Sequence, residues 1–496
     1  MKKRALFIVL ILLLILISCT KEKPTPNEVL DNIDDQKPRV QNNENQQESE
    51  KQVQENNQRP QIRKNTQPIQ TSVGITDPLA VFKPAKISLQ AFGKPFKDTT
   101  FGTTLTRVGE TERLVDDIGV QHWDRHTYSQ LQAFNLDNSL IMLNNNNLMT
   151  FRDMNDNLKI VYQFENVINT PRWNPINKHE VYHFRFFEER VSLLKTNVMS
   201  GETETVVEYP EKYVNIENTV SSEELSNDGR WIVAYLFDKN DDGYFVAYDL
   251  IDKKFGVQLG EHTELFNGPC GKFQDRDNAD EGGSYDAGPN WVRASPLGKM
   301  VIAWNRPGNE RCRGIEVLDI KTGKYIGHVG ESGSHSDVGL DKNGNEVYVA
   351  FYEGYIGATT FPGATSPNTF ESNPEKPYFQ VLLDPDYGHT WHLSCQGAPG
   401  VCVVTSEPEI KGNPFDDEIY LVYLDSDVQR GDNSNAKVRR LAHTRLDDTS
   451  CEVDGEFSYR MQPQASISRD GSYVVFASNW GKCGDASYSY LIDLRK

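Results

Sequence analysis

The chain has 496 residues, of which 37% are hydrophobic and 10% aromatic, and its formal net charge at pH 7 is −19. This charge repels a phosphate backbone, and no basic run interleaved with aromatic residues offsets it, which argues against nucleic-acid binding. The apolar content suffices for a large core, and the length exceeds that of a typical single domain unless the fold is a repeat.

The first residues have the features of a secretion signal. A short basic start precedes the apolar run Ala5–Ile17, which at 13 residues is too short to span a bilayer. The run ends in Leu16-Ile17-Ser18-Cys19, which resembles the lipobox of bacterial lipoproteins. The resemblance implies removal of residues 1–18 and acylation of Cys19, for example with palmitate. We therefore expect a protein of the cell envelope, held through its lipid anchor alone and facing the periplasm or the exterior.

A polar linker follows the anchor. Between Thr20 and about Thr71 the chain is almost entirely Asn, Gln, Glu, Lys, Asp and Pro, with no aromatic residue. Such a composition cannot bury enough apolar surface to fold. We expect residues 19–75 to form a disordered tether.

Apart from Cys19 the chain contains six cysteines, an even number in a chain that leaves the cytoplasm. Disulfides are therefore expected, although the sequence does not fix their connectivity. Pairing of neighbours is our hypothesis, because Cys395 and Cys402 flank a tight turn and the other two pairs each lie within one repeat. The cysteines are Cys270, Cys312, Cys395, Cys402, Cys451 and Cys483. None shows the paired spacing of a zinc ribbon.

A repeated unit decides the predicted fold. The unit consists of a strand, a polar turn that often ends in Asp-Gly or Asn-Gly, and a second strand. Seven copies occur, at residues 132–143, 172–183, 223–234, 292–303, 337–349, 392–406 and 464–478. Short strands at this spacing, without a convincing long helix between them, are typical of radially repeated antiparallel sheets.

The repeats resemble those of TolB-like and WD40-like propellers of secreted bacterial proteins. This resemblance implies an all-β, seven-bladed β-propeller over residues 95–496. The last repeat ends one strand short of a four-stranded blade, and residues 101–108 alternate like a strand. We predict that this early strand completes the last blade, which would hide an exposed edge.

One motif has the form of a zinc-peptidase site. His179-Glu180-Val181-Tyr182-His183 matches HExxH, in which two histidines one helical turn apart share a zinc ion. Here the motif falls where the other repeats have their second strand. On a strand the two histidines would lie about 13 Å apart and could not bind one ion. A zinc metallopeptidase therefore remains only a remote alternative.

A second motif has the spacing of calcium ligands. Asp238, Asn240 and Asp242, followed by Gly243 and by Asp249 at the twelfth position, satisfy an oxygen-ligand spacing like that of an EF-hand. The flanking segments are expected to be strands, so a hairpin turn is the alternative to a calcium site.

Polar residues of the last three repeats are predicted to line the central channel. When the repeats are aligned on their turns, His335, His392, Gln462 and Gln464 fall where the first strand of each blade faces one end of the channel. Arg172 falls in the equivalent position of an earlier repeat, and His126 lies close to another. These side chains either hydrate the channel or form a substrate or metal site.

This channel set resembles that of oligogalacturonate lyases, seven-bladed propellers in which three His and one Gln hold a manganese ion that binds the substrate carboxylate. In that family the last blade carries His-Pro-His, whereas this chain has Gln462-Pro463-Gln464. The resemblance implies an acidic polysaccharide as partner, with Mn as the cofactor if the channel site binds metal. Ca is the metal that the separate Asp238 motif would bind.

Cleavage of a uronic acid by β-elimination needs a base and a cation, for which His126, His335 and Arg172 are the candidates. Two interpretations stay open at this point: a polysaccharide lyase, and a non-catalytic propeller that binds a glycan or an envelope protein.

Overall fold

The computed structural model describes residues 72–495, with gaps at 111–123, 146–147, 165–169, 217–223, 261–287, 332–334, 353, 363–379, 386–391, 408–411, 447–451, 454–455, 458–461 and 482–486. The described residues all belong to one compact unit, residues 60–496. The signal, Cys19 and nearly all of the tether lie outside the described residues, as do Cys270, Cys451 and Cys483, so what is expected of them stays a prediction. Within the described part of the chain, no helix is long and apolar enough to cross a membrane.

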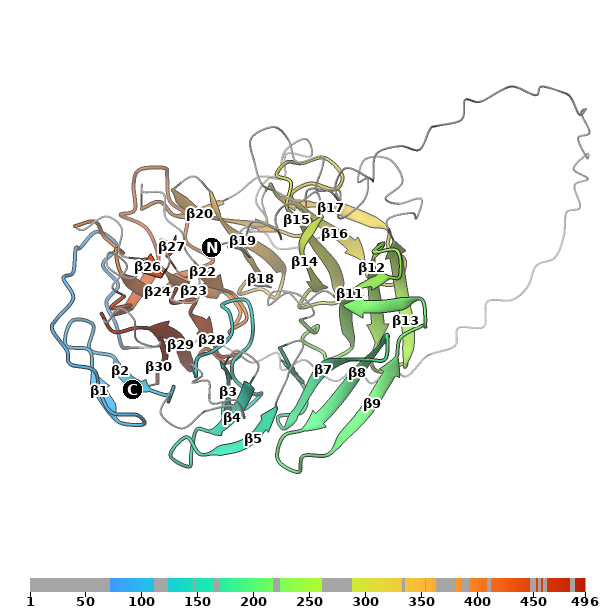
Figure 1. The fold of residues 1–496 in the computed structure, drawn as a ribbon. Coiled ribbons are helices and arrows are strands. Elements are labelled where there is room, and N and C mark those ends of the chain that lie inside the picture. Colours follow the sequence, from blue (N-terminus) through green and yellow to red (C-terminus); the bar gives the residue numbers. More distant parts are fainter. Residues whose placement is uncertain are drawn as a thin grey trace, which may run out of the picture. The chain divides into compact units, whose positions relative to one another are not determined.

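Seven antiparallel sheets form the blades of a β-propeller (Figure 1), which confirms the predicted fold class. Blade 1 has β3 (Leu140–Asn145), β4 (Leu148–Asp153) and β5 (Ile160–Phe164). Blade 2 has β6 (Arg172–Trp173), β7 (Glu180–Phe187), β8 (Arg190–Asn197) and β9 (Thr203–Glu208). Blade 3 has β10 (Tyr213–Ile216), β11 (Trp231–Asp238), β12 (Gly243–Asp249) and β13 (Lys254–Gly260). Blade 4 has β14 (Pro289–Ala294), β15 (Lys299–Trp304), β16 (Ile315–Asp319) and β17 (Tyr325–Gly330).

The remaining blades follow the same order. Blade 5 has β18 (Asp337–Leu340), β19 (Glu346–Tyr352), β20 (Tyr355–Thr360) and β21 (Gln380–Leu383). Blade 6 has β22 (His392–Ser394), β23 (Val401–Thr405), β24 (Glu418–Tyr423) and β25 (Val438–His443). Blade 7 has β28 (Ser466–Ile467), β29 (Tyr473–Ser478) and β30 (Tyr488–Asp493), joined by β2 (Thr104–Arg107) and β1 (Pro95–Lys97). A short hairpin, β26 (Glu452–Val453) and β27 (Glu456–Phe457), lies between blades 6 and 7 in the sequence.

The ring is closed by pairing of the two ends of the domain. β2 pairs antiparallel with β30, with Thr104 opposite Asp493 and Arg107 opposite Tyr490, and Figure 1 shows the two strands side by side. The predicted closing strand is therefore confirmed. Since β2 and β1 cover the outer side of β30, this strand is not left as an unpaired edge.

The core lies between neighbouring blades. Alternate residues of each strand point toward one neighbour or the other, so that two apolar faces meet at every interface. Between blades 3 and 4, for example, Trp231 and Phe245 pack with Met300, Ile302 and Trp304, all of them buried. A fully buried apolar side chain of this size contributes about 1.5–3 kcal/mol.

The chain before β1 binds along the outer edge of blade 6. Ile75 and Arg440 of β25 exchange backbone hydrogen bonds of 3.0 and 2.8 Å. The Arg440 guanidinium donates to the carbonyl oxygens of Asp77 and Ala80, and Trp480 Nε1 donates to the carbonyl oxygen of Ile87 at 2.8 Å. We call residues 72–92 the N-terminal strap. It protects the edge strand β25 from pairing with another chain.

Blade 1 lacks a regular innermost strand because that part of the chain enters the channel. Isolated bridges, Arg125 with Asn144 and Phe134 with Ile141, flank the irregular segment 126–133. Gln130 Nε2 donates to the carbonyl oxygen of Ser336 in blade 5. Gln132 Nε2 donates to the carbonyl oxygens of Gln396 in blade 6 and Ile467 in blade 7, at 3.3 and 3.1 Å. We call residues 125–134 the channel segment; it contacts blades 5, 6 and 7.

Candidate functional site

Two histidines of adjacent blades meet at one end of the channel. His392 opens β22, and His335 lies just before β18; both are innermost strands, which start at the same end of a propeller. Their imidazole rings stack with centroids 4.4 Å apart and planes inclined by 24°. His392 is fully buried, whereas His335 is partly exposed. The structure therefore presents His335 on the solvent side of the pair.

A guanidinium and the two predicted glutamines lie beside this pair. Arg125, at the start of the channel segment, donates through Nη2 to the side-chain oxygen of Gln464 at 2.7 Å and to the carbonyl oxygen of Gln462 at 3.3 Å. Tyr128 packs edge-on against the His392 ring, with centroids 5.4 Å apart. Blades 1, 5, 6 and 7 thus all contribute to one polar group, which we call the histidine cluster: Arg125, Tyr128, His335, His392, Gln462 and Gln464.

The electrostatics of the cluster keep its buried imidazole neutral. Burial lowers the pKa of His392 well below its ordinary value, and His335, Arg125 and His126 lower it further. A neutral imidazole can donate one hydrogen bond and accept another. Because Arg125 carries a positive charge close to His392, the potential at this end of the channel favours a negative ligand.

His126 is built into the protein rather than exposed to a ligand. Its Nε2 lies 2.5 Å from the carbonyl oxygen of Gln464, its Nδ1 lies 3.2 Å from Ser489 Oγ, and the side chain is fully buried. Burial, with Arg125 next to it, lowers its pKa to about 3. His126 therefore holds blade 7 against the channel segment, which is a positioning function.

Two residues of the cluster have a backbone conformation that is uncommon outside glycine. The φ angles are 49° at His335 and 45° at Gln464. For a residue with a Cβ atom this region costs about 1 kcal/mol or more, and such residues concentrate at ligand sites. His335 lies two residues before β18 and Gln464 two residues before β28, so the strained turn affects where their side chains point.

Arg172 contacts the acidic side chain of Glu224. Its Nε lies 3.9 Å from Glu224 Oε1, both side chains are buried, and Nη1 donates to the carbonyl oxygen of Thr170. Glu224 also accepts from the backbone N–H of Gln132 at 3.5 Å. Arg172 thus neutralises a buried carboxylate beside the channel segment, and Arg125 is the arginine that the structure brings to the histidines.

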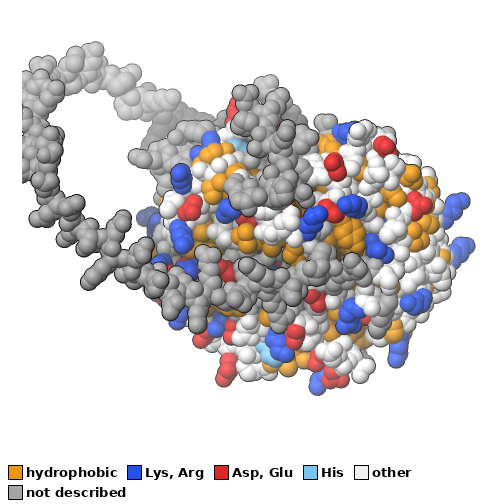
Figure 2. Space-filling model, turned by 180° about the vertical axis from the view of Figure 1, so that it is seen from behind, with side chains coloured by type: hydrophobic (Ala, Val, Ile, Leu, Met, Phe, Trp, Pro, Cys, Tyr) orange, Lys and Arg blue, Asp and Glu red, His pale blue; other side chains and the backbone are white. Residues whose placement is uncertain are grey.

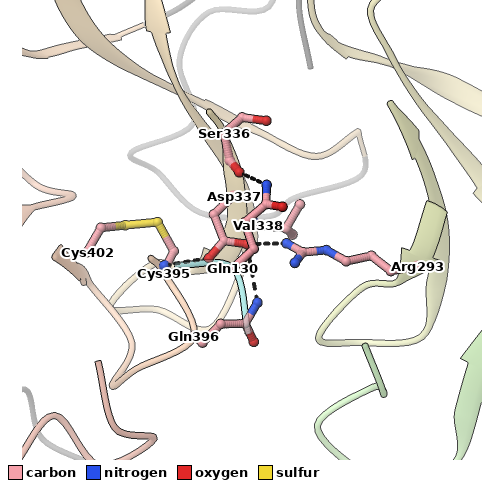
Figure 3. The surroundings of a disulfide bond; sticks show 8 residues. All are labelled: Gln130, Arg293, Ser336, Asp337, Val338, Cys395, Gln396 and Cys402. Carbon is pink, nitrogen blue, oxygen red and sulfur yellow. Dashed lines mark hydrogen bonds and ion pairs between the residues drawn. A yellow bond between two sulfur atoms is a disulfide. The ribbon is translucent and has the colours of Figure 1, made fainter. Parts of the chain in front are cut away.

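A buried ion pair joins three blades next to the cluster (Figure 3). The carboxylate of Asp337 pairs with Arg293 and accepts hydrogen bonds from the backbone N–H groups of Cys395 at 2.6 Å and Val338 at 2.8 Å. Cys395 forms a disulfide with Cys402, which confirms that predicted pair. Cys312 is also disulfide-bonded. Asp337 therefore ties blades 4 and 6 to the strand that His335 precedes.

The predicted ligand set does not fit a divalent metal as the structure arranges it. An ion lies about 2 Å from an imidazole nitrogen and in the plane of its ring. The ring planes of His335 and His392 are inclined by only 24°, so they intersect much farther from the rings than a metal–nitrogen bond reaches. No single ion can therefore lie in both ring planes within bonding distance of both rings. Among the described residues, no three His, Cys, Asp or Glu side chains form a group that could hold a metal ion.

The structure separates Asp249 from the other three residues with calcium-ligand spacing. Asp238 accepts from the backbone N–H groups of Asn240 and Asp242 within the β11–β12 turn. Asp249 lies opposite Trp231, six residues along β12 from Gly243 and so about 20 Å from the turn. Its carboxylate binds Arg230 at 2.7 Å. The twelve-residue spacing places four ligands around one ion only in a helix–loop–helix loop, and an antiparallel hairpin carries the last one away.

The HExxH segment lies on strand β7, as expected from the repeats. His183 Nε2 lies 2.9 Å from Thr196 Oγ1, and its ring packs on Phe164 with centroids 4.6 Å apart. Burial lowers the pKa of His183 to about 4. His179 precedes the strand, in the turn. The two histidines are four residues apart along extended chain, which is incompatible with a shared zinc ion.

Charge on the visible surface is mixed. Figure 2 shows basic and acidic side chains interspersed over the described part of one face, with hydrophobic side chains between them. The overall charge of −19 is therefore not gathered into a single acidic patch on that part of the surface.

Comparison with known proteins shows the fold. No protein-family model and no curated protein matches the chain. The oligogalacturonate lyase of Vibrio parahaemolyticus is a solved structure with a TM-score of 0.50 and 11% identity, covering 81% of this chain and 96% of the lyase. An oligogalacturonate lyase in complex with manganese has a TM-score of 0.49 and 12% identity, covering 85% and 97%. The chain is similar in fold to the Vibrio parahaemolyticus lyase: it is a seven-bladed β-propeller.

Proposed function

We propose that this chain is a lipid-anchored protein of the cell envelope whose propeller binds an acidic polysaccharide at the histidine cluster. The observation that carries the proposal is the convergence of Arg125 with His335 and His392 at one end of the channel. The amino-terminal sequence up to Cys19 supports the anchor, and the polar residues 20–71 would let the propeller reach polymer away from the membrane.

A uronic-acid carboxylate is the ligand that this chemistry favours. Arg125 supplies fixed N–H donors of the geometry that carboxylates accept. His335 is partly exposed and adds a polar ring edge, while Tyr128 and the His392 ring form an aromatic wall behind it. The positive charge of Arg125 is local, so it can attract a polyanion although the whole chain is acidic.

Cleavage by β-elimination is the second candidate, and the exposure of His335 favours it. In this reaction a base takes the proton from the carbon next to the carboxylate, a carbon–carbon double bond forms, and the glycosidic oxygen leaves with a proton. We assign proton removal to His335 and stabilisation of the enolate charge to Arg125. His126 is unsuitable as base because its ring nitrogens already contact Gln464 and Ser489.

Calorimetric titration with trigalacturonate tests the binding proposal, and the fold shared with oligogalacturonate lyases makes this the first probe to use. The fully methyl-esterified trisaccharide is the control, because it keeps the sugar rings and removes the negative charge. We expect the acid to bind and the ester to bind at least about tenfold more weakly. Equal affinity for both, or no affinity for any uronate polymer tested, would overturn the proposal.

Absorbance near 232 nm separates the two candidates, because β-elimination creates an unsaturated uronate. A signal that disappears in His335→Gln would establish cleavage. Binding without that signal would leave a non-catalytic propeller. If instead the protein captures an envelope protein and no glycan, the carbohydrate proposal fails.

A further inference from the structure

We infer that the guanidinium of Arg125, and not a divalent metal ion, is the cation that holds the ligand carboxylate at the histidine cluster. The identity of the ligand rests on the proposed function, whereas the absence of a metal requirement follows from the donor groups themselves. This channel therefore differs from one in which imidazoles and an amide surround an ion.

The amide oxygen that would complete a metal site is already used by a cation. Arg125 Nη2 donates to Gln464 Oε1 at 2.7 Å, and Gln464 is buried. An ion bound to this oxygen would lie within a few ångströms of the positive guanidinium, in a poorly solvated environment where like charges repel strongly. The carbonyl oxygen of Gln462 also accepts from Arg125. Gln462 and Gln464 therefore both orient Arg125.

The backbone holds Arg125 in place before any ligand binds. Its N–H donates to the carbonyl oxygen of Asn144 at 3.0 Å, and its own carbonyl oxygen accepts from Asn144 N–H at 2.5 Å. Its Nε donates to the carbonyl oxygen of His126 at 3.4 Å. A cation fixed in this way loses little conformational entropy when an anion arrives.

The histidines are arranged to complement an arginine. Their stacked rings cannot direct two nitrogens to one ion, but a stacked pair can present the edge of His335 to a ligand while His392 supports it from behind. Tyr128, three residues after Arg125, packs edge-on against the His392 ring with centroids 5.4 Å apart, so the segment that carries the guanidinium lies against the imidazole pair.

The first experiment uses manganese alone. Protein treated with EDTA and desalted is titrated with MnCl₂ in a calorimeter, and bound metal is measured after desalting. We expect less than about 0.1 Mn²⁺ per chain at micromolar concentration. Stoichiometric binding that is lost in His335→Gln would overturn the inference, whether or not any glycan binds.

The second experiment measures the affinity for trigalacturonate with and without EDTA. We expect the two values to agree within about twofold and Arg125→Gln to lower the affinity at least about tenfold. Arg125→Lys keeps the charge but loses the planar fork, so an intermediate affinity is expected. The control is Arg190→Gln, which removes one positive charge from an exposed pair with Glu211. This variant should bind like the unmodified protein.

The outcomes separate this inference from the proposed function. If the unmodified protein binds no uronate, the proposed function fails, and the manganese titration still decides the metal question. If uronate binds only after manganese is added, the proposed function stands and this inference fails. Because Arg125 is buried, its variants are first compared with the unmodified protein by circular dichroism and thermal unfolding; if Arg125→Gln does not fold, the Arg125→Lys and EDTA comparisons carry the test.

Discussion

Removing Arg293 should destabilise the propeller far more than removing a surface cation. In Arg293→Met the carboxylate of Asp337 stays buried and keeps its hydrogen bonds to Cys395 and Val338, but it loses its counter-charge. Both side chains are at most 1% exposed. Breaking such a pair costs about 3–5 kcal/mol of unfolding free energy, because one charge remains uncompensated.

The matched control is Lys178→Met. Lys178 Nζ lies 2.9 Å from Asp137 Oδ2, but these side chains are 47% and 41% exposed, and pairs in water contribute about 0–1 kcal/mol. Urea unfolding followed by circular dichroism compares the two variants. Adding Asp337→Asn to Arg293→Met should recover part of the loss, because it removes the uncompensated charge, although the single amide oxygen can accept from only one of the Cys395 and Val338 N–H groups. A loss below about 1 kcal/mol in Arg293→Met would refute the reasoning.

The pH dependence of the stability of Arg293→Met is a second, independent test of this ion pair. Burial raises the pKa of Asp337 above its ordinary value even with Arg293 in contact, and loss of Arg293 should raise it further. A carboxyl whose pKa is higher in the folded state binds more protons there than in the unfolded chain. The stability of Arg293→Met should therefore increase, relative to the unmodified protein, as the pH falls from about 8 toward about 5. If the difference in unfolding free energy between Arg293→Met and the unmodified protein stayed the same across this pH range, the raised pKa of Asp337 in the variant would be contradicted.

Three further predictions concern the strap, a buried carboxyl and the anchor. Burial and Asp416 raise the pKa of Asp417 to about 8, so its ionisation costs stability increasingly from about pH 4 up to pH 8; Asp417→Asn should flatten that part of the thermal-unfolding profile. Gly74 has φ +85°, and an added Cβ would lie 2.5 Å from the carbonyl oxygen of Arg440, so Gly74→Val should detach the strap and hasten proteolytic cleavage within residues 72–92. Cys19→Ser should abolish incorporation of labelled palmitate and release the protein from the membrane fraction, whereas Cys312→Ser should still incorporate label.

The sequence predicts the architecture because the propeller is assembled from local units. Each repeat contains its own strand–turn–strand pattern, and turns such as Asn227-Asp228-Gly229 and Asp470-Gly471 mark where the strands reverse. Even the closing strand β2 follows from counting strands in the last blade. None of this needs long-range information, since each blade repeats the same hydrogen-bonding pattern.

The site is harder to predict because its geometry depends on tertiary register. Alignment of the repeats brings His335 and His392 to one end of the channel, and they stack there. Arg125 and Tyr128 are not identified in this way, because they belong to a segment that leaves blade 1 and enters the channel. The four calcium-type ligands illustrate the opposite error: their linear spacing is right, but the hairpin between β11 and β12 separates Asp249 from the others.

A crystal structure of the protein with bound trigalacturonate tests the central claim most directly. We predict one carboxylate of the ligand within hydrogen-bonding distance of both the Arg125 guanidinium and the His335 ring, at the end of the channel where β18 and β22 begin, with no metal ion between them. A ligand bound on the outer strands of the blades, or a carboxylate held through a metal ion at His335 and His392, would contradict it.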